Sequence, residues 1–405
     1  MVAGVAIEEA PTHMRLIFGP ALQSDPHSTY RLFRENWPVA RIDWPHRGSG
    51  EYLITRYSDV ISIATSQGVS IDRSLAALPL SKQNRIEEPL FGTVLTLDNS
   101  VHANARRVLS SRLHRRTSAL EPVLERTFAQ LVGNYADGCE LDIIEDLAEP
   151  ICETMVAWIT GFDLAAVKAM QVPSEKFVSK GFTFGSEFVS PGVLDCVAYL
   201  KDAIRRQLMS SLPDETLLEA RLASGDRDVA SYDINTCLLV ITAGLQTTKH
   251  SIGNVLATLL EHPKLIEELR TSPTSVPSAV EECLRFDGPS QAVGRVLLRD
   301  TFMRDVLLKK GAFVRLALSA ANRDPEHFPD PDVPNIHRES CRHLAFGFSQ
   351  HACLGARITR ICLNVVVQGL LNEFPAIELS PRGSERLLGS SLRGYRSYFV
   401  TVKRA

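Results

Sequence analysis

The chain of 405 residues is 44% hydrophobic and 22% charged, which is typical of a globular protein with a sizeable core. Its net charge of −3 gives no reason to expect nucleic acid or an anionic membrane surface as the main partner. No uninterrupted apolar stretch approaches the roughly 20 residues that span a bilayer, and Met1–Pro20 lacks the pattern of a signal peptide. We therefore expect a cytoplasmic protein without a membrane anchor.

The eight cysteines are scattered along the chain without paired spacing. A disulfide framework is therefore not expected, and most cysteines are interpreted as small buried hydrophobic residues. The exception is Cys353.

The first hundred residues contain short strand-like runs such as Glu51–Thr55, set between loops with proline and glycine. From about Val101 to Phe286 helical periodicity dominates. Amphipathic helices are expected at Leu120–Val132 and Ile151–Ile159, where apolar residues recur at three- and four-residue steps.

The longest expected helix is Asp233–Leu260, which opens near Ser231 as an N-cap and stops before Pro263. At about 1.5 Å per residue it would span roughly 40 Å. It is apolar nearly all round through Leu238–Leu245, so we expect its middle to be buried.

Short strands return past residue 295, and a final helix is expected over Leu354–Leu371. The end of the chain, Tyr395–Val402, is predicted to be a strand of a terminal hairpin. No linker, repeat or low-complexity tract marks a boundary. The predicted fold is mainly α with small β-sheets, in one domain over residues 1–405.

Cys353 lies at the start of an apolar helix, after a loop with Gly347 and before Gly355. A helix amino terminus stabilises negative charge, and its free N–H groups can bond a thiolate, so this position suits a metal ligand. Gly355 keeps bulk away from whatever lies against the sulfur. Cys362, by contrast, is interpreted as an ordinary buried cysteine.

The segment 343–357 resembles the haem-ligand signature of the cytochromes P450, Phe-Gly-x-Gly-x-His-x-Cys-x-Gly. The positions that match are Phe346, Gly347, His351, Cys353 and Gly355. The resemblance implies that Cys353 is the axial thiolate of haem b, with His351 at a propionate and Phe346 near the sulfur. It also implies a cytochrome P450 fold with haem between the long central helix and the cysteine loop. Ser349 stands where the family has glycine, so we expect strain in the loop there.

Further segments match the family in the family's order. Glu282 and Arg285 match its Glu-x-x-Arg motif, and Ala321–Pro325 and Arg338 match the segments that follow. The resemblance implies that Glu282, Arg285 and Arg338 form a buried ion network that braces the haem loop.

A second set of matches concerns the haem propionates. His102 and Arg106 match a His-x-x-x-Arg pattern on one helix face, although Ser100 stands where the family often has proline. Arg295 matches a further propionate ligand.

The long helix carries Ala243-Gly244-Leu-Gln246-Thr247-Thr, and glycine followed by threonines is poor material for a buried helix. Such a local fault often marks function. The segment resembles the oxygen-activation motif of the family, in which Ala243 and Gly244 leave room for dioxygen and Thr247 hydrogen-bonds it and directs protons to it.

Gln246 departs from this motif, since the family commonly has Asp or Glu there. An amide forms hydrogen bonds but does not titrate. The acid step of proton delivery is then absent, rerouted through water or supplied by the substrate; the alternative is that this position simply tolerates amides.

The resemblance implies a haem-thiolate monooxygenase that inserts one oxygen atom of O2 into a mostly apolar small molecule, such as a terpenoid or aromatic. No reductase-like motif occurs in the chain, so electrons would come from NAD(P)H through an external reductase and a ferredoxin. The ferredoxin would dock on the arginine cluster Arg106, Arg107, Arg112, Arg115 and Arg116. For the outer members of this cluster, the equal alternative is an ordinary solvated helix face. One alternative is a peroxide-driven oxygenase or an oxidative-coupling or ring-rearranging haem enzyme; another, of a different class, is a non-catalytic relative that recruits a partner.

By family position, two groups of residues would surround the substrate. The pocket residues would be Leu239, Val240, Ala243, Gln246, Thr247, Ala292, Val293 and Leu392. The lid would come from the loop Leu75–Phe91 and from Phe177, Phe182, Phe184 and Phe188.

Overall fold

The computed structural model describes residues 25–42, 51–76, 90, 92–133, 135–181, 191–209, 231–388 and 392–404. By its contacts the chain divides into two compact units, each built from three separate stretches. We call residues 1–103, 290–333 and 342–353 the sheet unit, and residues 104–289, 334–341 and 354–405 the helical unit. The mainly helical architecture with small sheets is confirmed, whereas one domain over residues 1–405 stays a prediction.

The sheet unit contains a five-stranded sheet of order β1-β2-β8-β5-β3 and a separate two-stranded hairpin. In the larger sheet β2 and β8 are parallel and the other pairs are antiparallel. Its strands are β1 (Val39–Ile42), β2 (Glu51–Ile54), β3 (Val69–Ser70), β5 (Val293–Leu297) and β8 (Phe313–Leu316), and the hairpin is β6 (Thr301–Met303) with β7 (Val306–Leu308). The helices and helical turns are α3 (Pro26–Asn36), α4 (Tyr57–Thr65), η2 (Arg73–Leu75), α15 (Leu318–Ala321) and η6 (Ser349–His351).

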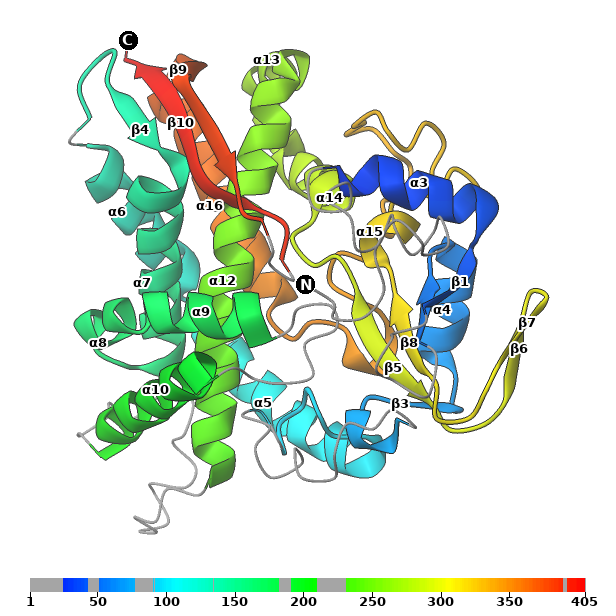
Figure 1. Cartoon of the computed structure of the whole chain (residues 1–405). Coiled ribbons are helices and arrows are strands. Elements are labelled where there is room, and N and C mark those ends of the chain that lie inside the picture. Colours follow the sequence, from blue (N-terminus) through cyan, green and yellow to red (C-terminus); the bar gives the residue numbers. More distant parts are fainter. Residues whose placement is uncertain are drawn as a thin grey trace. The chain divides into compact units, whose positions relative to one another are not determined.

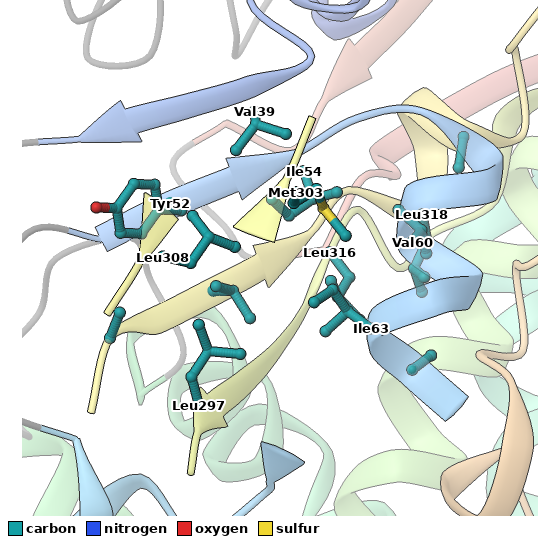
Figure 2. Packing of buried hydrophobic residues seen from close by; sticks show 14 of the residues in the cluster. Val39, Tyr52, Ile54, Val60, Ile63, Leu297, Met303, Leu308, Leu316 and Leu318 are labelled. Atoms are coloured by element: carbon teal, nitrogen blue, oxygen red, sulfur yellow. The ribbon is translucent and has the colours of Figure 1, made fainter. Parts of the chain in front are cut away.

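A hydrophobic core joins this sheet to α4 and α15. Figure 2 shows Val60 and Ile63 of α4 close to Leu316 of β8, with Leu318 of α15 beside them. Leu344, which begins the cysteine loop, belongs to the same buried cluster and is fully buried. The loop that carries Cys353 therefore starts from the core of the sheet unit.

The helical unit is built around one long helix and a three-stranded antiparallel sheet of order β4-β10-β9. The helices that precede the long one are α5 (Asn99–Thr117, whose first residues belong to the sheet unit), α6 (Leu120–Val132), η4 (Ile143–Ala148), α7 (Glu149–Thr160), α8 (Leu164–Ala169), α9 (Gln171–Gly181) and α10 (Pro191–Met209). The remaining elements are α12 (Ser231–Glu261), α13 (Pro263–Thr271), η5 (Pro273–Ser275), α14 (Val276–Asp287), α16 (Ala356–Glu373), β4 (Glu140–Asp142), β9 (Ala376–Arg386) and β10 (Tyr395–Lys403).

The long helix α12 lies among α7, α9, α14 and α16 of the helical unit (Figure 1). The sequence prediction of Asp233–Leu260 for this helix is confirmed, because α12 runs over Ser231–Glu261 and α13 begins at Pro263. The predicted helix Leu120–Val132 coincides with α6. The predicted terminal strand is β10, which pairs with β9 as a hairpin.

Among the residues that the structure describes, no helix is long and apolar enough to cross a membrane.

A close approach of two helices in the helical unit depends on Gly369 of α16. A Cβ atom added at Gly369 would lie 2.5 Å from Cε1 of Phe128 on α6. Phe128 is itself buried, so its ring has little room to retreat. The contact between α6 and α16 therefore requires a residue without a side chain at 369.

We expect Gly369→Ala to lower the free energy of unfolding by about 1–3 kcal/mol, the usual cost of overpacking. Gly192→Ala on α10 is the matched control, because nothing lies within 4 Å of an added Cβ there. Urea unfolding followed by circular dichroism should show a lower midpoint only for Gly369→Ala; equal midpoints in the two variants would contradict the packing argument.

Candidate functional site

The cysteine loop of the sheet unit is held by short backbone hydrogen bonds. The N–H of Gly347 donates to the carbonyl of Leu344 at 2.8 Å, and the N–H of Cys353 donates to the carbonyl of Phe346 at 2.8 Å. The N–H of Leu344 donates to Oδ1 of Asn322 at 2.6 Å, which attaches the loop to the end of α15. These bonds close the loop so that it begins and ends at neighbouring points.

Cys353 differs from the other seven cysteines in its exposure. It is exposed, whereas the others are buried or half-buried, and none is in a disulfide. Cys362 in α16 is fully buried, and burial raises the pKa of its thiol to about 12. Cys353 lies three residues before α16 begins. It therefore has both the access and the position near a helix amino terminus that a thiolate ligand requires.

Two residues of the loop have left-handed backbone conformations. Gly347 has φ +68°, which glycine adopts without cost. Ser349, which the sequence comparison predicts to be strained in place of a glycine, has φ +64°. An L-residue in this region carries about 1–2 kcal/mol of strain. The expected strain is thus located at Ser349. Gly355, by contrast, has φ −82°, which any residue adopts.

Basic side chains lie close together in the sheet unit, which also contains this loop. The rings of His102 and His351 lie 4.1 Å apart between centroids, and Nε2 of His351 lies 3.6 Å from Oδ1 of Asp98. Arg295 is 5% exposed; burial lowers the pKa of its guanidinium, and Asp98 opposes that shift. Asp98 also accepts hydrogen bonds from Ser70 and from the N–H of Ile71.

The geometry brings together three of the four residues expected at the haem propionates. The Asp98 carboxylate faces His351 and Arg295, and the ring of His102 packs against that of His351, so the group can take further negative charge. Arg106 follows one turn after His102 on α5 and is half-buried. An exposed thiol, the Arg295 guanidinium and two imidazoles that can donate hydrogen bonds fit a haem, whose propionates are anionic. Asp98 was not predicted from the sequence, although it lies one turn before His102.

The predicted ion network on Glu282 is present within the helical unit. Arg285 donates to both carboxylate oxygens of Glu282 at 2.8 Å, Arg338 Nε donates to Oε1 at 3.0 Å, and the N–H of Asn335 donates at 2.8 Å. Glu282 and Arg285 are each 1% exposed. Burial raises the pKa of Glu282, but these hydrogen bonds outweigh it and hold that pKa below its ordinary value.

The middle of α12 has one open stripe. Leu239, Val240, Gly244 and Thr247 are half-buried and Ala243 is exposed, whereas the other residues from Asp233 to Leu259 are buried. Residues 239, 243 and 247 recur every four positions, so they share a face of the helix. The hydroxyl of Thr247 donates to the carbonyl of Ala243 at 2.7 Å, which leaves its oxygen lone pairs as acceptors.

Gly244 belongs to the open stripe but also faces α7, whereas Gln246 lies elsewhere on the helix. A Cβ atom added at Gly244 would lie 2.8 Å from Cγ2 of Val156, so the contact of α12 with α7 already requires a small residue there. Gln246 is 1% exposed, and its Nε2 donates to the carbonyl of Gln171 on α9 at 3.3 Å. Gln246 is therefore directed into the helix layer and away from the open stripe.

The other expected pocket residues divide between the units. Ala292 and Val293 are half-buried in the sheet unit, and Val293 packs on its core. Leu392 is buried at 8% exposure in the helical unit. Of the expected lid, Phe177 is 2% exposed, as core residues are. Phe182, Phe184, Phe188 and most of the loop Leu75–Phe91 lie outside the described residues.

We expect Ser349→Gly to raise the urea midpoint of the haem-bound protein. Relief of about 1–2 kcal/mol of strain exceeds the 0.5–1 kcal/mol by which glycine favours the unfolded chain. The reciprocal variant Gly347→Ser, at nearly the same φ, should lower the midpoint, because the nearest atom to an added Cβ is 3.7 Å away and only backbone strain changes. A lower midpoint in Ser349→Gly would contradict this account.

Comparison with known proteins agrees with this geometry. The family model for cytochrome P450 matches residues 274–388. Cytochrome P450 107B1 of Saccharopolyspora erythraea is 31% identical over 379 residues, covering 90% of this chain and 91% of that protein. Pentalenic acid synthase of Streptomyces avermitilis is 28% identical over 366 residues, covering 89% of this chain and 90% of that protein.

A solved structure gives the same result for the fold. The cytochrome P450 enzyme CxnD, described as acting in C–S bond formation in chuangxinmycin biosynthesis, superposes with a TM-score of 0.84 at 26% identity over 94% of each chain. The cytochrome P450 fold expected from the resemblance is therefore confirmed. This chain belongs to the cytochrome P450 family and is a haem-dependent oxidoreductase that incorporates oxygen.

Proposed function

We propose that this enzyme is a ferredoxin-dependent monooxygenase of a mostly apolar small molecule, with Cys353 as the axial ligand of haem b. The observation that carries the assignment is the exposed thiol of Cys353, in one unit with the basic group of His102, His351 and Arg295. When bound, the haem supplies the activation of dioxygen. This basic group would hold the haem propionates, and Arg106, one turn after His102 on α5, would contribute a further contact to them.

The substrate side is argued from the open stripe of α12. Its half-buried or exposed residues Leu239, Val240 and Ala243 are apolar, and Thr247 is the one hydroxyl among them. An apolar surface of this kind favours a hydrocarbon-rich ligand such as a terpenoid or aromatic. The hydroxyl of Thr247, which donates to the carbonyl of Ala243 in this structure, would donate its hydrogen bond to dioxygen instead.

Purified Cys353→Ala should lose the thiolate-type Soret band that the reduced protein shows with carbon monoxide, because no thiolate would remain on the iron. Cys362→Ala is the matched control, since Cys362 is fully buried and its pKa is raised. Cys362→Ala should keep the band. Retention of the band in Cys353→Ala would refute the ligand assignment.

The docking surface for ferredoxin is proposed on the exposed side of α5. Arg107 and Arg115 are exposed there. Arg116 has a different role, because its guanidinium donates to the carbonyl of Trp158 on α7 and lies 4.6 Å from the ring centroid of Trp158. Arg116 is therefore not part of the proposed docking surface.

Charge reversal at Arg115 should raise the apparent Michaelis constant for an added acidic ferredoxin, and added salt should weaken turnover, because ions screen exposed charges over about 10 Å at 0.1 M. Arg205→Glu on α10 changes net charge equally at a half-exposed site and should leave that constant unchanged. Substrate binding, measured by the spin-state shift, should stay the same in both variants. Turnover with NADPH alone, or salt-independent reduction, would exclude the ferredoxin assignment.

A second candidate function is an oxidative-coupling, ring-rearranging or peroxide-driven reaction on the same haem. The observation that favours it is Gln246, an amide buried against α9 in place of an acid. Product formation supported equally by peroxide and by ferredoxin with NADH would favour this candidate.

A further inference from the structure

A buried ion cluster lies between α12 and its neighbours α7 and α9. Nζ of Lys249 on α12 is 3.0 Å from Oε1 of Glu149 on α7 and 3.1 Å from Oε2 of Glu175 on α9. Lys249 is 2% exposed, whereas the side chains of Glu149 and Glu175 are 26% and 36% exposed. The two carboxylates therefore reach from a buried ammonium toward solvent.

Glu149 is connected to Gln246 through Gln171, whereas Glu175 reaches Gln246 only through Lys249 and Glu149. Nε2 of Gln171 donates to Oε1 of Glu149 at 3.2 Å, and Nε2 of Gln246 donates to the carbonyl of the same Gln171 at 3.3 Å. Gln246 directly precedes Thr247 on α12. A polar connection therefore runs from a partly exposed carboxylate to the residue beside the proposed oxygen-binding threonine.

Three buried polar atoms along this connection have no hydrogen-bond partner among the described residues. They are Oε1 of Gln246, Oε1 of Gln171 and Oγ of Ser174, on side chains that are 1%, 5% and 0% exposed. An unsatisfied buried polar group costs about 1–3 kcal/mol, and such groups are usually satisfied by ordered water. Each of these atoms, from α12 and the first turn of α9, can accept a hydrogen bond from an ordered water.

The charges of the cluster explain why an amide fits at 246. Lys249 already faces the carboxylates of Glu149 and Glu175. Glu153, one turn after Glu149, adds a third acid; burial raises its pKa. A carboxylate at 246 would add negative charge to a buried site that already has an excess of it, which is costly.

We propose that Glu149 is the proton-donating acid of this enzyme and that it acts through water held by Gln171, Ser174 and Gln246. The proposal rests on the proposed monooxygenase function, in which one atom of dioxygen leaves as water and two protons are taken up with two electrons from NAD(P)H. Glu149 gives a proton inward and takes one from solvent at its exposed side. Because amides do not titrate, the proton travels on the bound water past Gln246, and further water must carry it around α12 to Thr247, whose side chain lies on another face of the helix.

The competing explanation is that the cluster only braces α12. Glu149 and Glu175 make equivalent bonds to Lys249, so a brace would lose as much from Glu149→Gln as from Glu175→Gln. Only Glu149 also bonds Gln171. The two substitutions are therefore a matched pair in which the proton connection is the difference.

The experiment compares Glu149→Gln and Glu175→Gln in the haem-bound enzyme with ferredoxin, reductase and a substrate that gives a spin-state shift. We expect Glu149→Gln to lower product per NADH at least tenfold, to divert electrons to hydrogen peroxide and to raise the solvent isotope effect, since acid assistance is worth about 10²–10⁴-fold. Glu149→Asp should restore part of the product. Glu175→Gln should stay within about twofold of the parent, while both glutamine variants show similar unfolding midpoints and substrate dissociation constants.

Equal loss of product in the two glutamine variants, or no change in coupling and isotope effect in Glu149→Gln, would overturn the proposal. The carbon monoxide spectrum of the parent separates this failure from failure of the proposed function. If the parent shows the thiolate-type band but Glu149→Gln has the coupling and isotope effect of the parent, only the proposed proton delivery by Glu149 is refuted. A parent without the band refutes the haem-thiolate assignment.

Discussion

The helical unit depends most on the hydrogen bonds that the buried carboxylate of Glu282 accepts. It accepts hydrogen bonds from Arg285, Arg338 and the N–H of Asn335, so it holds residues 334–341 against α14. Removing one partner of a buried ion pair typically costs 3–5 kcal/mol, because the other charge stays buried without compensation. The position of the chain just before the cysteine loop is thus determined by electrostatics inside the helical unit.

The need to compensate buried charge also organises the two functional regions, but the excess charge has the opposite sign in each. In the sheet unit, His351 and Arg295 face Asp98 and His102 packs on His351, and the group favours an anion such as a propionate. In the helical unit, Lys249 faces two carboxylates, and the cluster favours a transferable proton. The group in the sheet unit therefore attracts an anion, and the carboxylates in the helical unit attract a proton.

The sequence predicts what depends on local pattern and spacing. The bounds of α6 and α12 follow from periodicity, whereas the Glu282 network and the strain at Ser349 are implied by the resemblance to the family. The contacts of Lys249 with Glu149 and Glu175 join residues 100 and 74 positions apart, and no local pattern reveals them. Lys249 is the only lysine or arginine in Ser231–Glu261, and this is the one signal that the sequence offers. The direction of Gln246 and the bond of Arg116 to Trp158 likewise depend on which helix packs alongside.

The central claim is that the exposed thiol of Cys353, alone among the eight cysteines, binds the haem iron. X-ray absorption at the iron edge of the ferric enzyme tests it most directly, because it reports the ligand atoms without reference to turnover or partner. The account predicts one sulfur scatterer in the first coordination shell of the parent, retained in Cys362→Ala and absent in Cys353→Ala. A first shell of nitrogen and oxygen alone in the parent, or an unchanged sulfur signal in Cys353→Ala, would contradict it.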